Sequence, residues 1–303
     1  MDPPHSGIHA APVAVAEAAA NQPFPFEPGE ILTYNITFSK LIFSGYIGQL
    51  KLLVKDARTP PPKDAAPALT SPSQRQASPS HSPEQSARPE TQAPSLPPGM
   101  QGDPTTIEFG AEVASRGFFT RLFGVRIEDR YGAVVRSEDF CLVRSWKDID
   151  QGDLHRHHET TVDRELGALS YSETDRNKRG VITAKTGGCP RWILDLLSAV
   201  YFVRTKDLKE GNTITLPVTD VGQVYMIDVV PGKREEVVVE AGKFRSVQLD
   251  LKIFDGKYIR RSGQLLVWLS DDAKRLPVKA RLKSSGTTVN ITLARLEKPQ
   301  LTR

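Results

Sequence analysis

The sequence predicts a mainly β protein, in which a curved antiparallel sheet or incomplete β-barrel is wrapped around one central α-helix. Three observations predict this fold. Short segments in which apolar and polar residues alternate, the pattern of half-buried strands, recur over most of the chain. Glycine-containing turns such as 241–243 and 284–286 join the later segments and favour antiparallel neighbours. One segment, residues 189–204, is apolar nearly all round a helix, which is typical of a buried helix.

The composition sets limits on function. The 303 residues carry a formal net charge of +4 at pH 7 and a pI of about 9.0, without a long run of Lys or Arg. A solvated surface explains such a weak, dispersed bias, so we expect no nucleic-acid partner. The helical segment is shorter than the roughly 20 residues that cross a bilayer, and we expect no transmembrane segment.

Two segments are predicted to lie outside the folded domain. Residues 1–23 are rich in Ala and Pro but lack the basic start and long apolar run of a secretory signal, so they are predicted to be a disordered tail or a signal remnant. Residues 59–104, rich in Pro and Ser, are predicted to be a disordered insertion. Because the hairpin before this insertion is too small to fold alone, residues 24–298 are predicted to form a single β-rich domain that the insertion interrupts.

The strands follow in order from this pattern. The first two are predicted at residues 32–38 and 46–54, and the clearest alternation lies at residues 247–253. The helix follows the break at Gly187 and Gly188, and Pro190 suits its first position, where a missing N–H costs nothing. The other strands are predicted at residues 107–113, 134–146, 155–163, 168–174, 181–184, 213–218, 223–230, 235–240, 245–254, 263–269, 278–283 and 287–296.

Aromatic residues form the first candidate for a ligand site. Phe118, Phe119 and Phe123 lie close together in the sequence, on either side of Arg121. They are explained either as part of the packed core or as the mouth of an apolar pocket. The sequence leaves both interpretations open.

Polar residues of the helical segment form the second candidate. Asp195 and Ser198 lie one turn apart in an otherwise apolar helix, and both need polar partners if the helix is buried. One interpretation is an internal ion pair between Asp195 and Arg191; the other is a polar spot in a ligand cavity that Trp192 and Leu196 also line.

Metal and catalytic chemistry have weaker support. His155 and His157 lie on one face of a predicted strand, about 6–7 Å apart, close enough to share a Zn²⁺, and Glu159 would extend that face. A polar exposed strand explains these residues as well. Asp271 and Asp272 fit a turn better than a pair of catalytic carboxylates. We assign no catalytic residue and no cofactor, because no nucleophile, phosphate-binding or dinucleotide motif is found.

The two cysteines leave an alternative open. Cys141 and Cys189 could form one disulfide that ties the start of the helix to a strand, closing a loop of roughly 50 residues. Two buried free thiols explain them equally well.

Three stretches together resemble a family of exported bacterial proteins known as domain of unknown function 3108. They are the strand entry at residues 26–34, the helix at residues 195–204 and the ending at residues 267–278. The turn at residues 241–244 is similar too. The resemblance spans residues 26–296, apart from the insertion. It implies a periplasmic or secreted β-rich domain without an established activity, and it assigns no catalytic residues.

Our leading expectation is a non-enzymatic bacterial envelope or secreted protein that binds an apolar ligand, such as a lipid, between sheet and helix, or that binds another envelope protein. One alternative is a structural or interaction module with a packed core. The other alternative is a metal-dependent hydrolase at the strand that carries His155 and His157.

Overall fold

The computed structural model describes residues 24–41, 43–55, 106–116, 126–178, 180–254 and 263–297. The predictions for residues 1–23 and 59–104 lie outside these residues, as do those for Phe118, Phe119 and Phe123. The division into tail, insertion and single domain therefore stays a prediction. Among the described residues, no helix has the length and apolar character needed to span a membrane.

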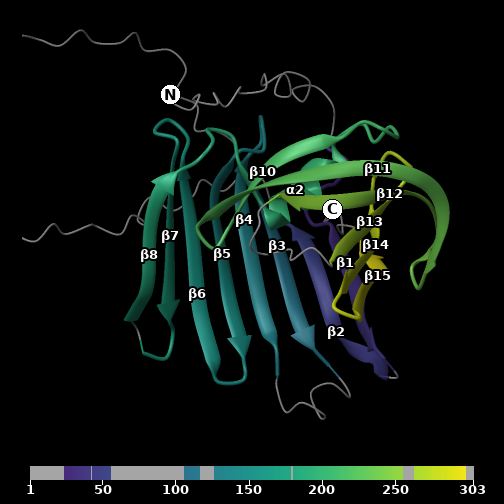
Figure 1. Ribbon diagram of the computed structural model, residues 1–303, viewed down its shortest axis with the longest axis horizontal. Coiled ribbons are helices and arrows are strands. Elements are labelled where there is room, and N and C mark those ends of the chain that lie inside the picture. Colours follow the sequence, from purple (N-terminus) through teal and green to yellow (C-terminus); the bar gives the residue numbers. More distant parts are fainter. Residues whose placement is uncertain are drawn as a thin grey trace, which may run out of the picture. The chain divides into compact units, whose positions relative to one another are not determined.

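Within the described ranges, fifteen strands form one sheet (Figure 1). The first eight strands are β1 (Ile31–Lys40), β2 (Phe43–Val54), β3 (Thr106–Ser115), β4 (Glu128–Arg136), β5 (Leu142–Gln151), β6 (Leu154–Asp163), β7 (Ala168–Asp175) and β8 (Gly180–Gly188). The others are β9 (Leu194–Asp195), β10 (Ile214–Asp220), β11 (Gln223–Val239), β12 (Gly242–Phe254), β13 (Gln264–Ser270), β14 (Pro277–Ser284) and β15 (Thr287–Glu297).

The sheet is open, with β8 at one end and β9 at the other. Its order is β8-β7-β6-β5-β4-β3-β2-β1-β15-β14-β13-β12-β11-β10-β9. Neighbouring strands pair antiparallel, except for the short parallel pair of β9 and β10. The prediction of a mainly β, antiparallel fold is confirmed. β2 pairs with β3, so the strands on both sides of residues 56–105 belong to the same sheet.

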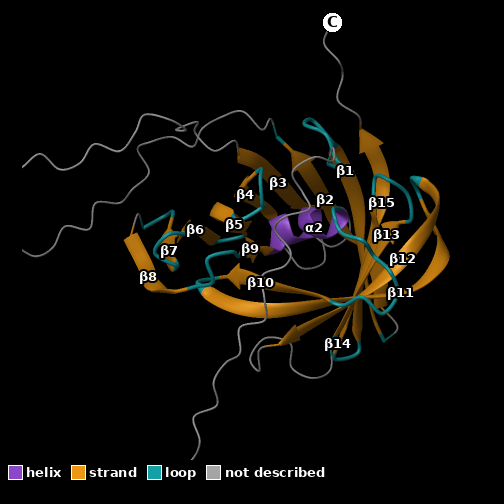
Figure 2. Cartoon of the chain, turned by 90° about the horizontal axis from the view of Figure 1, so that it is seen from above, coloured by secondary structure: helices purple, strands orange, loops and turns teal. Residues whose placement is uncertain are grey.

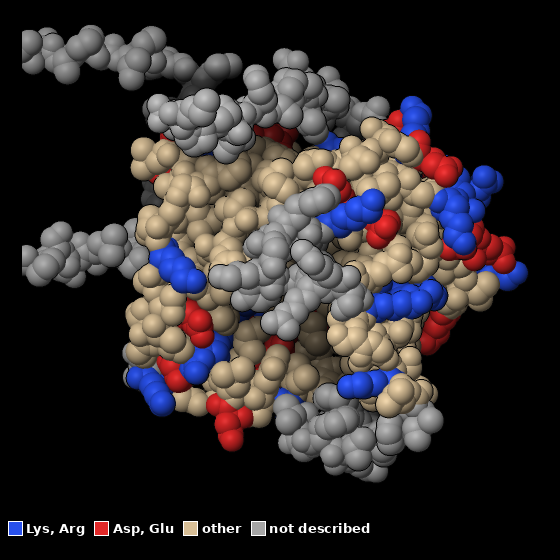
Figure 3. Space-filling view, viewed as in Figure 1, with Lys and Arg blue, Asp and Glu red and all other residues tan. Residues whose placement is uncertain are grey.

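Alternation places core residues on one face of strands such as β12. In β12, Val247 and Leu249 are fully buried, while Gln248 between them donates to the Glu235 carboxylate from the other side. In β1, Leu32 and Tyr34 are buried, and so is Thr33 between them. On the face seen in Figure 3, basic and acidic side chains are interspersed, without one dominant patch.

The helix differs from its prediction. α2 (Leu196–Arg204) has nine residues and begins seven residues after Cys189, where the predicted helical segment starts. It contacts β3, β4, β9 and β10 (Figure 2). Leu196 and Val200 are exposed, so the helix is not buried all round. The structure therefore shows one open sheet and one short helix in the described residues, in place of the long buried helix that the apolar pattern predicts.

Local chemistry explains the later helix start. Asp195 is extended, with φ −103° and ψ 177°, and its carboxylate accepts a hydrogen bond from the backbone N–H of Ser198, which makes it the N-cap. Leu194 and Asp195 pair with β10 before the helix begins. Ile193 and Leu194 are fully buried although both precede the helix, and apolar spacing alone does not distinguish this burial from that of a helical stripe.

The last turn of α2 lies in the most aromatic part of the core. Tyr201 stacks on Phe109 with a ring centroid distance of 4.0 Å and meets Phe26 edge-on at 5.3 Å. Arg204, at the helix end, is 1% exposed and forms an ion pair of 2.6 Å with Glu30. A charged group that ends the helix is thus held inside the core by one carboxylate.

Candidate functional site

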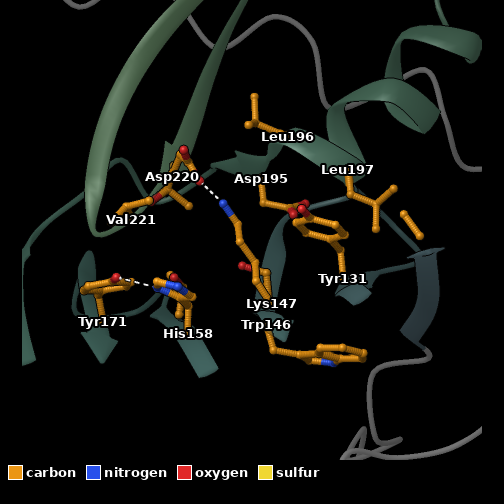
Figure 4. Close-up of a pocket in the computed structure, with 14 residues that line it drawn as sticks. Tyr131, Trp146, Lys147, His158, Tyr171, Asp195, Leu196, Leu197, Asp220 and Val221 are labelled. Carbon is orange, nitrogen blue, oxygen red and sulfur yellow. Dashed lines mark hydrogen bonds and ion pairs between the residues drawn. The ribbon is translucent and has the colours of Figure 1, made fainter. Parts of the chain in front are cut away.

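A cavity of about 210 Å³ lies where three parts of the fold meet, and we call it the α2 pocket (Figure 4). Strands β3 to β7 form its floor, the first turn of α2 forms one wall, and the tip of the β10–β11 hairpin closes over it. Its lining residues are Ala111, Tyr131, Ser145, Trp146, Lys147, His158, Thr160, Tyr171, Asp195, Leu196, Leu197, Thr219, Asp220 and Val221.

Strand register brings the floor residues to one face. Lys147 lies directly opposite His158, and Thr160 lies directly opposite Tyr171. Paired residues project from the same face of a sheet, and alternate residues of a strand return to that face. Trp146 therefore points its indole to the other side of β5, as Figure 4 shows.

The hairpin tip is fastened to the floor at two points. Lys147 of β5 forms an ion pair with Asp220 at the end of β10. Gly222 lies so close to Tyr171 that a Cβ atom at this position would be 2.9 Å from the Tyr171 Cβ. Val221 and Gly222 have φ values of 50° and 71°, as a two-residue hairpin turn requires, and this conformation is strained for a β-branched residue such as Val221.

Asp195 is the buried acid of the pocket. Its Oδ1 accepts hydrogen bonds from the Ser198 N–H at 2.8 Å and the Ser198 hydroxyl at 2.5 Å, while Ser198 Oγ accepts from the Asp195 N–H at 3.0 Å. This capping box satisfies the helix N-terminus from within. Burial raises the pKa of Asp195 above its ordinary value of 3.8, although the hydrogen bonds from Ser198 and Leu197 and the charge of Lys147 act in the opposite direction.

Asp195→Asn is expected to remove a pH-dependent loss of stability. The folded-state pKa of Asp195 is raised, so its contribution to stability is complete below the unfolded value of about 3.9 and is lost as the pH rises through the folded-state pKa. Asn also caps helices, so the variant keeps the helix start. The free energy of unfolding of both proteins is measured with urea at a series of pH values from about pH 4 upwards. As the pH rises, the wild type should lose stability relative to the variant. A difference that does not vary with pH would contradict this expectation.

His158 and Tyr171 form a second polar group on the floor. His158 Nδ1 and the Tyr171 hydroxyl share a hydrogen bond of 2.8 Å (Figure 4). Burial raises the pKa of Tyr171 to about 12, with a further contribution from the Glu173 carboxylate. Burial lowers the pKa of His158, so its imidazole is uncharged near neutral pH.

Thr219 is the buried polar side chain of the pocket without a partner. It lies opposite Asp195 in the parallel pair of β9 and β10 and is 3% exposed. Its Oγ1 has no hydrogen-bond partner among the described residues. Buried hydroxyl groups are usually hydrogen-bonded, so this one needs an explanation.

The predicted ligand-site residues of the helical segment have different positions in the structure. Asp195 and Leu196 line the α2 pocket, whereas Ser198 acts as the capping partner of Asp195. Trp192 packs against Phe202 and donates to the Asp139 carbonyl, and it is not among the residues that line the pocket. The predicted ion pair between Arg191 and Asp195 is wrong, because the helix begins after both residues and Arg191 is exposed.

His155 and His157 lie on the other face of β6 from His158. Their Nδ1 atoms lie 2.7 Å from Asp150 and 2.8 Å from Asp148, respectively. Among the residues that the structure describes, no group of three or more His, Cys, Asp or Glu side chains has the arrangement of a metal site. Each of these histidines thus lies beside one carboxylate of the neighbouring strand.

The cysteines are free thiols in this structure. Cys141 is buried and its Sγ donates to the Arg191 carbonyl at 3.4 Å, and Cys189 is partly buried. Burial raises the pKa of both thiols. The disulfide alternative is not formed here, and the thiols remain protonated at neutral pH.

Sequence reasoning missed most of the pocket. Lys147, His158, Tyr171, Thr219 and Asp220 come from four strands, and no spacing along the chain joins them. One available signal was the alternation of β6, which places His158 on the inner face when His155 and His157 lie outside.

Its open, mainly antiparallel sheet places the chain in the class of mainly β, barrel-like proteins. Within it, the chain belongs to the family described as "Protein of unknown function (DUF3108)", whose sequence profile matches residues 100–294. The resemblance to this family is thereby confirmed, and the matched residues include the helix and the ending, whereas the strand entry at residues 26–34 lies outside them. No curated protein matches the chain.

Three solved structures are similar to this chain over most of its length, and the first of them shares its fold. A β-barrel-like protein of the domain of unknown function DUF1849 from Brucella abortus superposes with a TM-score of 0.54 and 7% identity, covering 90% of this chain and 98% of that chain. A protein from Bacteroides fragilis, described as exported and YmcC-like in fold, gives 0.33 and 10%, covering 91% and 98%. A protein from Parabacteroides distasonis described as a lipoprotein gives 0.33 and 8%, covering 90% and 97%. At 7% identity, the similarity to the first structure shows the fold alone. The TM-scores of the other two structures are too low to support a conclusion about this chain.

Proposed function

We propose that the protein is a non-enzymatic binding protein of the bacterial envelope or the secreted fraction, and that it holds a small, largely apolar ligand, such as part of a lipid, between the sheet and α2. The observation that carries this proposal is the α2 pocket, a concave site of about 210 Å³ at which three separate parts of the fold converge. In this arrangement the sheet curves around α2, and the first turn of the helix forms one wall.

The lining supports binding more than chemistry. Tyr131, Leu197 and Val221 present apolar surface, and a few polar groups lie between them, as in small-molecule sites. The ionisable groups are engaged with partners within the protein, in the Lys147–Asp220 ion pair and in the capping box of Asp195. The strained backbone at Val221 also supports a binding role, because such strain is common at ligand clamps.

The proposed location rests on the resemblance to exported bacterial proteins. The protein expressed from its own gene in its native bacterium should be recovered in the periplasmic or secreted fraction. Recovery in the cytoplasmic fraction alone would overturn this part of the proposal.

Filling the pocket tests the binding function. Ser145 is buried on the floor, and Ser145→Leu is expected to occupy the cavity. Ser172→Leu, on the other face of β7, is the matched control, because its neighbour Tyr171 faces the pocket. Native mass spectrometry of protein purified without detergent should show a discrete adduct on wild type and on the control, and none on Ser145→Leu. An adduct that survives in Ser145→Leu, or a wild type that carries no adduct and binds no added probe, would overturn the proposal.

The open edge of the sheet favours a second candidate function, an interaction module. β8 ends the sheet, and within the described residues no strand pairs with its outer edge. Val181 and Ile182 of this strand are exposed. Exposed edges accept strands from partners, and a lysine there opposes such pairing. Ile182→Lys should then lose an envelope partner in pull-downs while keeping the adduct, and an unchanged set of partners would remove this candidate.

A further inference from the structure

The α2 pocket is lined by charged groups of both signs, yet no charge is available to a ligand. Lys147 and Asp220 neutralise each other. The Asp195 carboxylate is held by the first turn of α2, and this also occupies the helix N–H groups that would otherwise attract an anion. The imidazole of His158 is bonded to the Tyr171 hydroxyl and is uncharged near neutral pH.

An ionic ligand would therefore meet a repulsive or already satisfied partner. A carboxylate or phosphate would lie beside Asp195 and Asp220 without a free cation, since Lys147 is paired. An ammonium group would lie beside Lys147 and would have to displace it from Asp220. Burying an unpaired charge is costly, so both classes are disfavoured.

One polar group of the pocket remains without a partner. Thr219 Oγ1 is buried and unpaired among the described residues, and it lies beside Asp195 through the pairing of β9 and β10. Oγ1 has almost no accessible surface in the empty pocket, so the Thr219 side chain must rotate to present its hydroxyl to a ligand. A neutral group can then satisfy it, because a hydroxyl both donates and accepts hydrogen bonds. Leaving it unpaired destabilises the empty state.

The cavity also limits the size of the bound group. A volume of about 210 Å³ is below the range typical of sites for drug-sized ligands. A head group or a short chain of similar bulk fits, and the exposed side chains of Leu196 and Val221 at the rim offer apolar surface to a part that remains outside.

We propose that the α2 pocket selects an uncharged amphiphile, in which a neutral hydroxyl or ester group pairs with Thr219 and a short apolar body fills the space beside Tyr131 and Leu197. This inference rests on the proposed binding function and specifies the chemistry of its ligand. Fatty acids and amines of the same length are excluded by charge, whereas fatty alcohols and monoacylglycerols fit.

Three probes of equal chain length test the selection by charge. Binding of n-hexanol, hexanoate and n-hexylammonium to the purified full chain is measured at pH 7 by ligand-detected NMR titration. We expect n-hexanol to bind at least tenfold more tightly than either ion. Tighter binding of hexanoate or n-hexylammonium would overturn the inference and leave the binding function standing. If none of the three binds and native mass spectrometry finds no adduct, the binding function itself fails.

A pair of threonine variants tests the role of Thr219. Thr219→Val keeps the shape of the side chain and removes the hydroxyl, and it should weaken n-hexanol binding about two- to tenfold, the range of one neutral hydrogen bond. Thr215→Val, at an exposed position of the same strand, is the control and should bind n-hexanol as wild type does. Because Thr219 Oγ1 has no partner in the protein, Thr219→Val should remain folded. Equal n-hexanol binding by a folded Thr219→Val and wild type would refute the role of Thr219.

Discussion

Glu30→Gln is expected to lower the free energy of unfolding by about 3–5 kcal/mol, because it leaves a buried guanidinium without its counter-charge. Glu30 is 6% exposed and Arg204 is 1% exposed. The carboxylate of Glu30 accepts from Nη1 and Nη2 of Arg204 at 2.6 and 3.1 Å. The carbonyls of Pro25 and Lys274 accept further hydrogen bonds from Arg204, but neither carries a charge.

Urea unfolding and thermal melting measure this loss, and the chain offers a matched control. Glu108→Gln makes the same substitution in the Lys55–Glu108 ion pair, whose side chains are 48% and 34% exposed. This change should cost no more than about 1 kcal/mol, because exposed pairs contribute little. At about 2–4 °C per kcal/mol, Glu30→Gln should lower the melting temperature by roughly 6–20 °C. Similar losses in both variants would show that burial does not set the strength of the Arg204 pair.

Tyr201→Ala is expected to cost about 3–5 kcal/mol, as truncations of large buried aromatic residues do. Its ring is fully buried between Phe109 and Phe26, and the Arg204 guanidinium lies 5.4 Å from its centre. Removing the ring empties the place where α2 meets β3. The expected loss appears as a lower urea midpoint with an unchanged slope.

Tyr201→Phe separates the ring from its hydroxyl. The Tyr201 hydroxyl is buried without a hydrogen-bond partner among the described residues, and burial raises its pKa. Removing an unpaired buried hydroxyl is expected to leave stability unchanged or to raise it by about 1 kcal/mol. A loss of more than about 1 kcal/mol in Tyr201→Phe would mean that the hydroxyl has a partner, such as a buried water.

The sequence predicts strands such as β12 well because one face of the strand is buried. The alternation in β12 identifies Val247 and Leu249 as core residues, and both are fully buried. The helix start is predicted less well. Ile193 and Leu194 fit an apolar helix, yet both precede α2, because Asp195 caps the helix and β9 pairs with β10. The spacing of apolar residues indicates which residues are buried, but it does not indicate the backbone conformation of those residues.

The α2 pocket is the part of the structure that the sequence predicts least well. The sequence singles out Asp195 because a polar group in an apolar helix needs a partner, and Asp195 lines the pocket. The sequence does not predict the ion pair between Lys147 and Asp220, because this contact depends on how the two ends of the open sheet approach each other. Contacts between such distant strands depend on the order of the strands and the curvature of the sheet, which local sequence patterns do not encode.

The order of the strands also bears on how the chain folds. β1 pairs with β15, from Ile31 opposite Glu297 onwards, so the strands that come first and last in the chain are neighbours in the middle of the sheet. The two open ends of the sheet are β8 and β9, which are consecutive in the chain. A circular permutant that links β15 to β1 and opens the chain between β8 and β9 would turn the sheet into a simple meander. Its contact order would be lower, and proteins of low contact order fold faster. In the natural chain, closure of the β1–β15 pair is the step with the largest loop entropy to overcome.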